Sequence, residues 1–465
     1  MVTHGKERSE GDAEKSTATG DSHDLAGAII TRWRRAIVPS WADKNFHILL
    51  AARLAMSASR AVAGVITALY LSSEGFSGVE IGVLFVVVTI ASATMSITIG
   101  LISDRVGRRP FLVAVPLLTA AAAVVFGTVR IPAMLFIFAA LGSLGRGAGA
   151  GGAGVGPYQP AESAFVAEGV PGKHRADAFG RLAFSSSLGA LLGGLLAGLA
   201  HGRPGMGAVE AASAYHPAFL AAALLALTAG LLALGLNEAL RPKESGKSNF
   251  HWPRRSWPVL WRFWITNGVN GFAIGLSGPF ISYWFNRRFG AGPGKIGLLF
   301  AIIAFGSLVS SLSAAGIARR MGTVNTITIV RAISALLLVP IALAPSFLVA
   351  GALYFVRMLS QRLGMPLRQS FTQDMADPAE RSSLAALSNL PLQATMGGSQ
   401  ALAGYLFDEV SLAAPFELAA VFQCANTAFF WILFHWKPPK QAASLFGTEV
   451  EIAAEAEATD DPGVF

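Results

Sequence analysis

The sequence predicts an all-α membrane protein with twelve transmembrane helices in two six-helix halves. Of the 465 residues, 53% are hydrophobic and 14% are charged, whereas soluble domains carry roughly 25% charged residues. Apolar runs near or above the ~18 residues that span a bilayer recur along most of the chain. The second six runs repeat features of the first six. The twelve runs begin near Phe46, Val79, Phe111, Pro132, Phe179, Pro217, Val259, Gly294, Val324, Ser346, Ser382 and Pro415.

The basic residues predict the orientation of the chain, because they gather in alternate loops, as the positive-inside rule describes. Both termini are therefore expected in the cytoplasm, which an even number of spans requires. The net charge of +8 does not indicate nucleic-acid binding, since the charges lie in short loops rather than on one polar face. The loops assigned to the cytoplasm carry Arg32, Arg34, Arg35, Arg105, Arg108, Arg109, Lys173, Arg175, Arg241, Lys243, Lys247, Arg254, Arg255, Arg319, Arg320, Arg381, Lys437 and Lys440.

These spans and loops divide the chain into five parts. We expect a disordered cytoplasmic tail over 1–44, an N-terminal half over 45–236, a cytoplasmic linker over 237–258, a C-terminal half over 259–436, and an acidic, disordered cytoplasmic tail over 437–465. The protein is expected to be a monomer that crosses the plasma membrane many times, in a bacterium the inner membrane.

An internal repeat relates the two halves. EIGVLF at Glu80–Phe85 matches KIGLLF at Lys295–Phe300 at a separation of 215 residues (295 − 80), and Pro160 matches Pro366 at a separation of 206 (366 − 160). Parallel repeats of this kind place a solute site between the halves, near the middle of the membrane. Because the separation falls, the first half holds extra residues before Pro160.

Those extra residues lie in a glycine-rich stretch, GRGAGAGGAGVGPYQP, from Gly145 to Pro160. It contains the G-x-G-x-x-G spacing twice, which suggests a dinucleotide loop only where a strand precedes it and a helix follows. The apolar run IPAMLFIFAALGSL before it is too long for a usual strand. We therefore expect no cofactor here, and glycines that let the fourth helix bend or pack closely. The single Cys424 and the absence of ligand-spaced His pairs predict no metal either.

One loop motif resembles the signature of the major facilitator superfamily. GLISDRVGRRP at Gly100–Pro110 falls in the predicted loop between helices 2 and 3, where that family has G-x-L-a-D-r-x-G-r-[rk]-p. A degenerate copy, GIARRMG at Gly316–Gly322, falls in the repeat-related loop. The resemblance covers about 46–436 and implies a transporter that works by alternating access. The residues it assigns to a conformational latch are Gly100, Asp104, Arg105, Gly107 and Arg108.

The resemblance also implies how this latch works. In the family, the loop Asp contacts the start of helix 11 in the outward-facing state. Here Asp377 and Glu380 are placed as the N-cap and N3 residues of helix 11, which would offer Asp104 a positive helix end. Gly100 is expected to let helix 2 approach a neighbour closely. Alternatively, the Arg cluster serves only to orient the helix.

Helix 5 shows a partial likeness to the signature of the drug/proton antiporter branch. Gly180, Gly189, Gly193 and Gly198 fit its spacing, but Gly194 stands where Pro is expected. Small residues at these intervals serve plain helix packing equally well.

Ionisable and amide side chains inside the predicted spans are the candidates for a substrate and coupling cavity, because burying them in a membrane is costly. Arg60 in helix 1 is expected to line the cavity, and Arg53 to extend toward the cytoplasmic surface. Arg146 resembles the Arg of the family's helix-4 motif, which is associated with coupling. Glu162 is either a proton carrier or the partner of an Arg. The complete set is Arg60, Arg146, Glu162, Asn267, Asn270, Arg357 and Gln361.

These observations favour a secondary active transporter of a small solute, with proton-coupled efflux as the expected direction. The excess of embedded Arg over acid keeps open the uptake or exchange of an organic anion, because Arg is a bidentate ligand of carboxylate and phosphate. A sensor that kept the fold without transport is a further alternative. No P-loop, catalytic triad or metal cluster indicates an enzyme.

Overall fold

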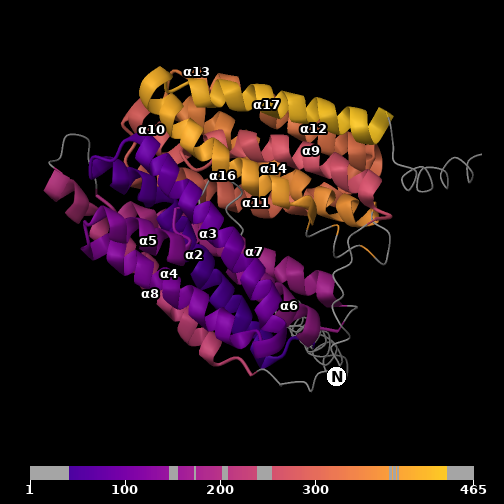
Figure 1. The fold of residues 1–465 in the computed structure, drawn as a ribbon, viewed down its shortest axis with the longest axis horizontal. Coiled ribbons are helices and arrows are strands. Elements are labelled where there is room, and N and C mark those ends of the chain that lie inside the picture. The colour runs from indigo at the N-terminus through magenta and orange to yellow at the C-terminus, as the bar shows by residue number, and fades with distance from the viewer. Residues whose placement is uncertain are drawn as a thin grey trace, which may run out of the picture.

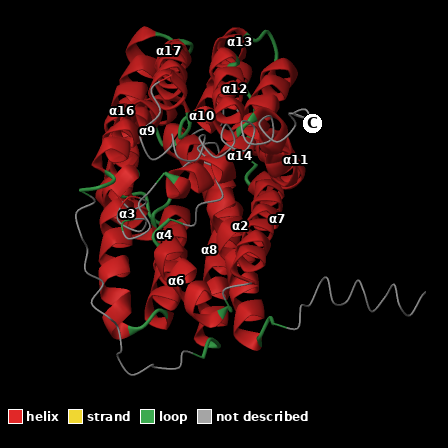
Figure 2. Cartoon of the chain, turned by 90° about the vertical axis from the view of Figure 1, so that its right-hand side faces the viewer, coloured by secondary structure: helices red, strands yellow, loops and turns green. Residues whose placement is uncertain are grey.

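The computed structural model describes residues 41–145, 156–171, 174–201, 208–237, 254–375 and 387–436, with Glu380 and Leu384 between the last two ranges. The tails predicted over 1–44 and 437–465 and the linker predicted over 237–258 fall almost entirely outside these residues. The described part is helical and contains no strand (Figure 2).

The first six predicted runs correspond to the helices of the N-terminal half, which lies at the lower left in Figure 1. Helices form at these runs because the polar backbone groups of an apolar segment can be hydrogen-bonded in lipid only within the segment itself. The helices are α2 (Lys44–Ser73), α3 (Gly78–Val106), α4 (Arg109–Thr128), α5 (Pro132–Gly142), α6 (Tyr158–Gly169), α7 (Arg175–Leu196), the short η2 (Ala197–Leu199) and α8 (Ala208–Leu234).

The last six runs correspond to the helices of the C-terminal half, which lies at the upper right in Figure 1. Across both halves, seven helices of the described residues are long and apolar enough to cross a membrane unaided. The helices of this half are α9 (Trp257–Ser277), α10 (Ile281–Phe289), α11 (Pro293–Met321), α12 (Thr323–Leu336), α13 (Leu338–Leu343), α14 (Phe347–Asp374), α16 (Leu390–Tyr405), η3 (Leu406–Val410), α17 (Ala414–Trp431) and η4 (Ile432–Trp436).

Local capping sets where the first spans begin. The Asp43 carboxylate accepts from the Phe46 N–H at 2.8 Å at the start of α2. Ser77 and Glu80 form a reciprocal capping box at the start of α3, which satisfies backbone donors that have no partner inside the helix. We call the side of the bundle where α2 begins the near side, and the side where α2 ends the far side.

The fourth span differs from the bent helix that the sequence suggests, because α5 ends at Gly142 and α6 begins only at Tyr158. Ser143, directly after α5, has φ +52°, and Gly145 has φ +80°, so the backbone leaves the helical region here. The corresponding helix of the other half, α14, runs for 28 residues without a break. The segment before the glycines is thus a helix, which removes the strand that a dinucleotide loop requires. Arg146 lies outside the described residues.

Three hydrophobic clusters show how the halves meet. The largest contains residues of both halves and lies on the far side, where Phe85 packs edge-on against Phe280. On the near side, one cluster around Leu49 and Tyr158 belongs to the N-terminal half alone. Another, around Phe263, belongs to the C-terminal half alone. The halves therefore share a core on the far side and have separate cores on the near side, as expected of a transporter open toward the near side.

Glycines allow the close approach on the far side. A Cβ at Gly404 in α16 would overlap the carbonyl oxygen of Gly78 at the start of α3. At a second contact between the halves, a Cβ at Gly194 in α7 would lie 2.7 Å from the carbonyl oxygen of Gly297 in α11. At both contacts the helix backbones touch almost directly, a geometry that small residues permit in membranes.

An acidic side chain reinforces the contact between the end of α16 and the start of α3. The Asp408 carboxylate of η3 accepts from the Val79 N–H in the first turn of α3, at 3.0 Å. The unpaired N–H groups and the dipole of a helix N-terminus attract an anion. Asp408 therefore holds the far side closed by a contact between the two halves.

Replacing Asp408 with Asn is expected to weaken this closure by about 0.3–2 kcal/mol, because the carboxylate charge at the helix end is lost. The measurement is the distance distribution between spin labels at Thr128 and Ser346, exposed far-side positions in different halves, in a Cys424→Ser background. We expect a larger population at long distance. Glu409→Gln, a neighbouring exposed acid, is the control and should leave the distribution unchanged. An unaltered distribution in Asp408→Asn would remove the proposed role of this contact.

Candidate functional site

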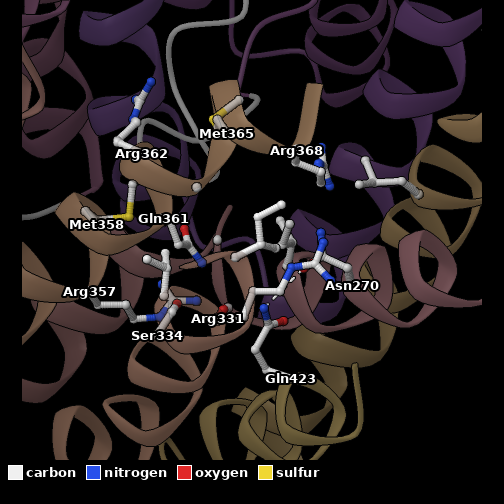
Figure 3. Close-up of a pocket in the computed structure, with 17 residues that line it drawn as sticks. Asn270, Arg331, Ser334, Arg357, Met358, Gln361, Arg362, Met365, Arg368 and Gln423 are labelled. Atoms are coloured by element: carbon white, nitrogen blue, oxygen red, sulfur yellow. Dashed lines mark hydrogen bonds between the residues drawn. The ribbon is translucent and has the colours of Figure 1, made fainter. Parts of the chain in front are cut away.

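A cavity of about 190 Å³ lies within the C-terminal half. Its walls come from α9, α12, α14, α16 and α17, and its polar side chains include guanidinium, amide and hydroxyl groups but no carboxylate among the described residues (Figure 3). The polar lining residues are Asn270, Ser277, Arg331, Ser334, Arg357, Gln361, Arg362, Arg368 and Gln423.

Amide oxygens hold two of the four arginines. Arg331 in α12 donates from Nη1 to Oδ1 of Asn426 at 3.3 Å, and its guanidinium lies 4.5 Å from the ring centroid of Phe430. Arg368 in α14 donates from Nη1 to Oδ1 of Asn267 at 3.4 Å. Neutral amides and a ring fix the positions of these cations without cancelling their charge.

The other two arginines, the buried Arg357 and the half-buried Arg362, have little local compensation. Arg357 is 5% exposed, and its Cζ lies 5.9 Å from the ring centroid of Tyr354. In the part of the chain that the structure describes, the Nε atoms of Arg357 and Arg362 and the Ser334 hydroxyl have no hydrogen-bond partner. Since a buried polar group without a partner is costly, these donors are available to a ligand.

The amides of α9 tie the wall of the cavity together. Oδ1 of Asn270 accepts from Nε2 of Gln423 at 3.2 Å and from Nδ2 of Asn426 at 3.4 Å. Asn267 donates to the Ser388 carbonyl at 2.6 Å. Of the candidates from the sequence, Asn270, Arg357 and Gln361 line the cavity, and Asn267 holds an arginine that lines it.

The described candidates in the N-terminal half, Arg60 and Glu162, are not among the residues that line this cavity. Arg53 does not extend toward the surface as expected, but is buried and forms an ion pair with Glu162 of α6. The pairing reflects packing, because both side chains sit in the interior of their half and each charge compensates the burial of the other. Arg60 lies against the backbone at Gly156, where a Cβ would be 2.9 Å from its Nη1.

The repeat relates this ion pair to the cavity. At the separation of 206, Glu162 corresponds to Arg368 (368 − 162). The N-terminal half therefore pairs its buried Arg53 with its own acid, while the C-terminal half has Arg368, bonded to the amide of Asn267, at the position that corresponds to this acid.

The latch residues are partly described. Gly107 ends α3 with φ +104°, which favours glycine. Arg108 donates to the Ser103 hydroxyl at 3.0 Å and forms an ion pair with Glu168 of α6 at 2.5 Å. A Cβ at Gly100 would meet no atom of the described residues within 4 Å, so the close approach expected of α3 at this point is not seen among them.

The proposed partner of the loop motif lies mostly outside the described residues, as do Asp377 and the side chains of Asp104 and Arg105. Glu380 is described, and its carboxylate accepts from the backbone N–H groups of Arg255 and Ser256, at 3.2 and 2.8 Å. It thereby links the start of helix 11 to the start of α9, a contact that the sequence did not indicate.

The sequence also missed Arg331, Arg362 and Arg368. Arg331 lies inside the apolar run TVNTITIVRAISALLLVP, so the rule that selected Arg60 would have found it. Arg331 belongs to the predicted ninth helix, whereas all the candidates named from the sequence belong to other helices.

The glycines compared with the antiporter signature have packing contacts. A Cβ at Gly189 would overlap the Leu54 carbonyl oxygen of α2, and one at Gly193 would overlap that of Ala58. These two glycines therefore bring α7 against α2, and the antiporter resemblance gains no support from them.

Comparisons with known proteins agree with this architecture. The sequence matches the profile of the Major Facilitator Superfamily over residues 49–269 and 263–456. No protein of curated function matches the sequence.

Solved structures of transporters share the fold. A bacterial homolog of the human lysosomal transporter Spinster, in an inward-facing and unoccupied conformation, has a TM-score of 0.64 at 13% identity, covering 85% of this chain and 97% of that one. The nucleoside transporter NupG has a TM-score of 0.65 at 14% identity, covering 85% and 100%. A peptide transporter in complex with sulfate has a TM-score of 0.64 at 14% identity, covering 85% and 94%. With the family profile matched along both halves, the chain belongs to the major facilitator superfamily.

Proposed function

We propose that this protein moves a small anionic solute across the membrane by alternating access, binding it in the arginine-lined cavity of the C-terminal half. The observation that carries the proposal is the cavity's charge: Arg331, Arg357, Arg362 and Arg368 line it, and no carboxylate does among the described residues. Buried arginines need an anion or a set of acceptors, and guanidinium groups bind carboxylate and phosphate in a fixed geometry.

The two halves differ in how they compensate a buried arginine, and this difference supports an anionic solute. There the ion pair of Arg53 with Glu162 supplies the negative charge from within the protein. In the C-terminal half, Arg368 stands at the position that corresponds to Glu162, and it bonds to the neutral amide of Asn267. An anionic solute would supply the charge that this half lacks, whereas a lipophilic cation would be repelled by every arginine of the cavity.

Direction and coupling extend the proposal. Under the positive-inside rule the near side is the cytoplasm, so the cavity of this inward-open form would load or release solute there. The loop motif favours efflux, and Glu162 is the buried acid that could exchange a proton. The proposed setting is the inner membrane of a bacterium, with both termini cytoplasmic and the protein monomeric.

The test is flux in proteoliposomes made with the full chain. A panel of small carboxylates, phosphate esters and lipophilic cations is offered with and without an imposed pH gradient. We expect flux of anions, and a loss of about ten-fold or more in apparent affinity in Arg331→Gln, because a charge-assisted hydrogen bond contributes about 1.5–3 kcal/mol. Stimulation by an opposing proton gradient would support exchange with protons.

Arg288→Gln, which alters an exposed arginine on the far side, is the matched control and should transport as the unaltered protein does. Arg331→Lys keeps the charge but loses the planar donor fork, so an intermediate affinity is expected. Flux confined to lipophilic cations and undiminished in Arg331→Gln would refute the proposal.

A further inference from the structure

Arg331 and Arg357 lie on opposite sides of the cavity, as Figure 3 shows. The guanidinium of Arg331 extends toward Asn270 and Gln423, and Arg368 lies above them; we call this the Arg331 end. Arg357 lies on the opposite side of the cavity with Gln361 and Ser334; we call this the Arg357 end.

Each end has its own set of donors. At the Arg331 end, Asn426 and the Phe430 ring hold the guanidinium in place. At the Arg357 end, Nε of Arg357 and the Ser334 hydroxyl are buried and have no partner in the part of the chain that the structure describes. Arg357 and Arg368 are eleven residues apart on α14, so their Cα atoms are about 16 Å apart along the helix at ~1.5 Å per residue.

A solute with one negative charge would satisfy only one end. The other end would keep a cation whose charge nothing compensates, and at the Arg357 end also buried donors without a partner among the described residues, facing a neutral group, which is unfavourable. A site that bonds to a polar group of its ligand discriminates strongly against an analogue that lacks this group. An apolar pocket discriminates much more weakly between ligands that differ only by a methylene group.

We infer that the solute carries two separated anionic groups, one bound at the Arg331 end and one at the Arg357 end, as in a short linear dicarboxylate. This inference rests on the proposed function and narrows it from an anion to a dianion. Arg362 and Arg368, which line the same cavity, add positive potential that favours the second charge.

The experiment compares dicarboxylates with their monoamides, which have nearly the same shape and one charge fewer. Succinate, glutarate and adipate, and the three monoamides, are titrated against the purified full chain, and affinity is obtained from the ligand-dependent rise in melting temperature. We expect at least one dicarboxylate to bind about ten-fold or more tightly than its own monoamide.

Variants assign the two charges to the two ends. Arg357→Gln should weaken the dicarboxylate but not the monoamide, so that the two affinities differ by less than about three-fold, since Gln can bond to the neutral amide. Arg288→Gln should preserve the full difference. Sulfate, which carries both charges on one group, should bind less tightly than the best dicarboxylate.

Three results would overturn the inference in different ways. Equal binding of each acid and its monoamide in the unaltered protein would show a monoanion site and leave the proposed function standing. Tighter binding of sulfate than of every dicarboxylate would place both charges at one end. Failure of every anion in the series, sulfate included, to raise the melting temperature would count against the anion cavity itself, and so against the proposed function.

Discussion

Replacing Glu162 with Gln is expected to destabilise the protein by about 3–5 kcal/mol, the effect of removing one partner from a buried ion pair. The side chains of Arg53 and Glu162 are 8% and 2% exposed, so water cannot replace the lost carboxylate. The measurement is the melting temperature of the purified protein, which should fall by several degrees.

A second ion pair of the same half provides the control. Arg108 and Glu168 also join α6 to a neighbouring segment, but the Glu168 side chain is 53% exposed. Ion pairs in contact with water contribute about 0–1 kcal/mol, so Glu168→Gln should change the melting temperature little. Equal losses in the two variants would contradict the assignment of the Arg53 and Glu162 pair as the buried, energetically dominant one.

The double variant Arg53→Gln and Glu162→Gln separates the two roles open to Glu162. Two amides can bond to each other, so much of the lost stability should return. If Glu162 is only the partner of Arg53, flux in the double variant should keep its dependence on the pH gradient. If Glu162 carries the proton, stability should return while that dependence is lost.

Replacing Gly404 with Ala is expected to open the far side of the transporter. The added Cβ would overlap the Gly78 carbonyl oxygen, and because both atoms belong to helix ends, relief requires α16 and α3 to separate. The spin-label pair at Thr128 and Ser346 should then show mainly long distances, and transport should fall because the far side no longer closes.

Gly398 is the matched control on the same helix, since a Cβ there would meet no atom within 4 Å. Gly398→Ala should keep the short distance, and should stabilise α16 slightly because Ala is favoured over Gly by about 1 kcal/mol inside a helix. A short distance retained in Gly404→Ala would mean that the halves do not close through this contact.

The start of most spans could be predicted from the sequence because it depends on local signals. The run placed near Pro132 begins at Pro132 as α5, and the run placed near Val79 begins at Gly78 as α3. Hydropathy marks the span, and a capping residue or proline marks its first turn. Both signals lie within a few residues of each other.

The pairing of Arg53 with Glu162 could not be predicted in the same way, because the two residues are 109 positions apart and meet only when α2 and α6 pack into one bundle. The break after Gly142 was also hidden, since glycines permit a bend and a break equally. Asn270, Arg357 and Gln361 could be named as candidates from their depth in the predicted spans, and the same rule applies to Arg331. That all four line one cavity could not be predicted, because it depends on how α9, α12 and α14 pack.

The C-terminal half has Arg368 where the N-terminal half has Glu162, and this difference affects the stability of the protein when no solute is bound. In the N-terminal half Glu162 compensates the buried Arg53, but at the position that corresponds to Glu162 the C-terminal half has a cation, Arg368. If the cavity binds as proposed, the solute acts as a removable part of that half's interior, and ligand at 100 times its Kd would stabilise it by about 2.7 kcal/mol. Purified without solute, the protein should therefore begin to unfold in its C-terminal half, and hydrogen exchange there, rather than in the N-terminal half, should slow when the solute is restored.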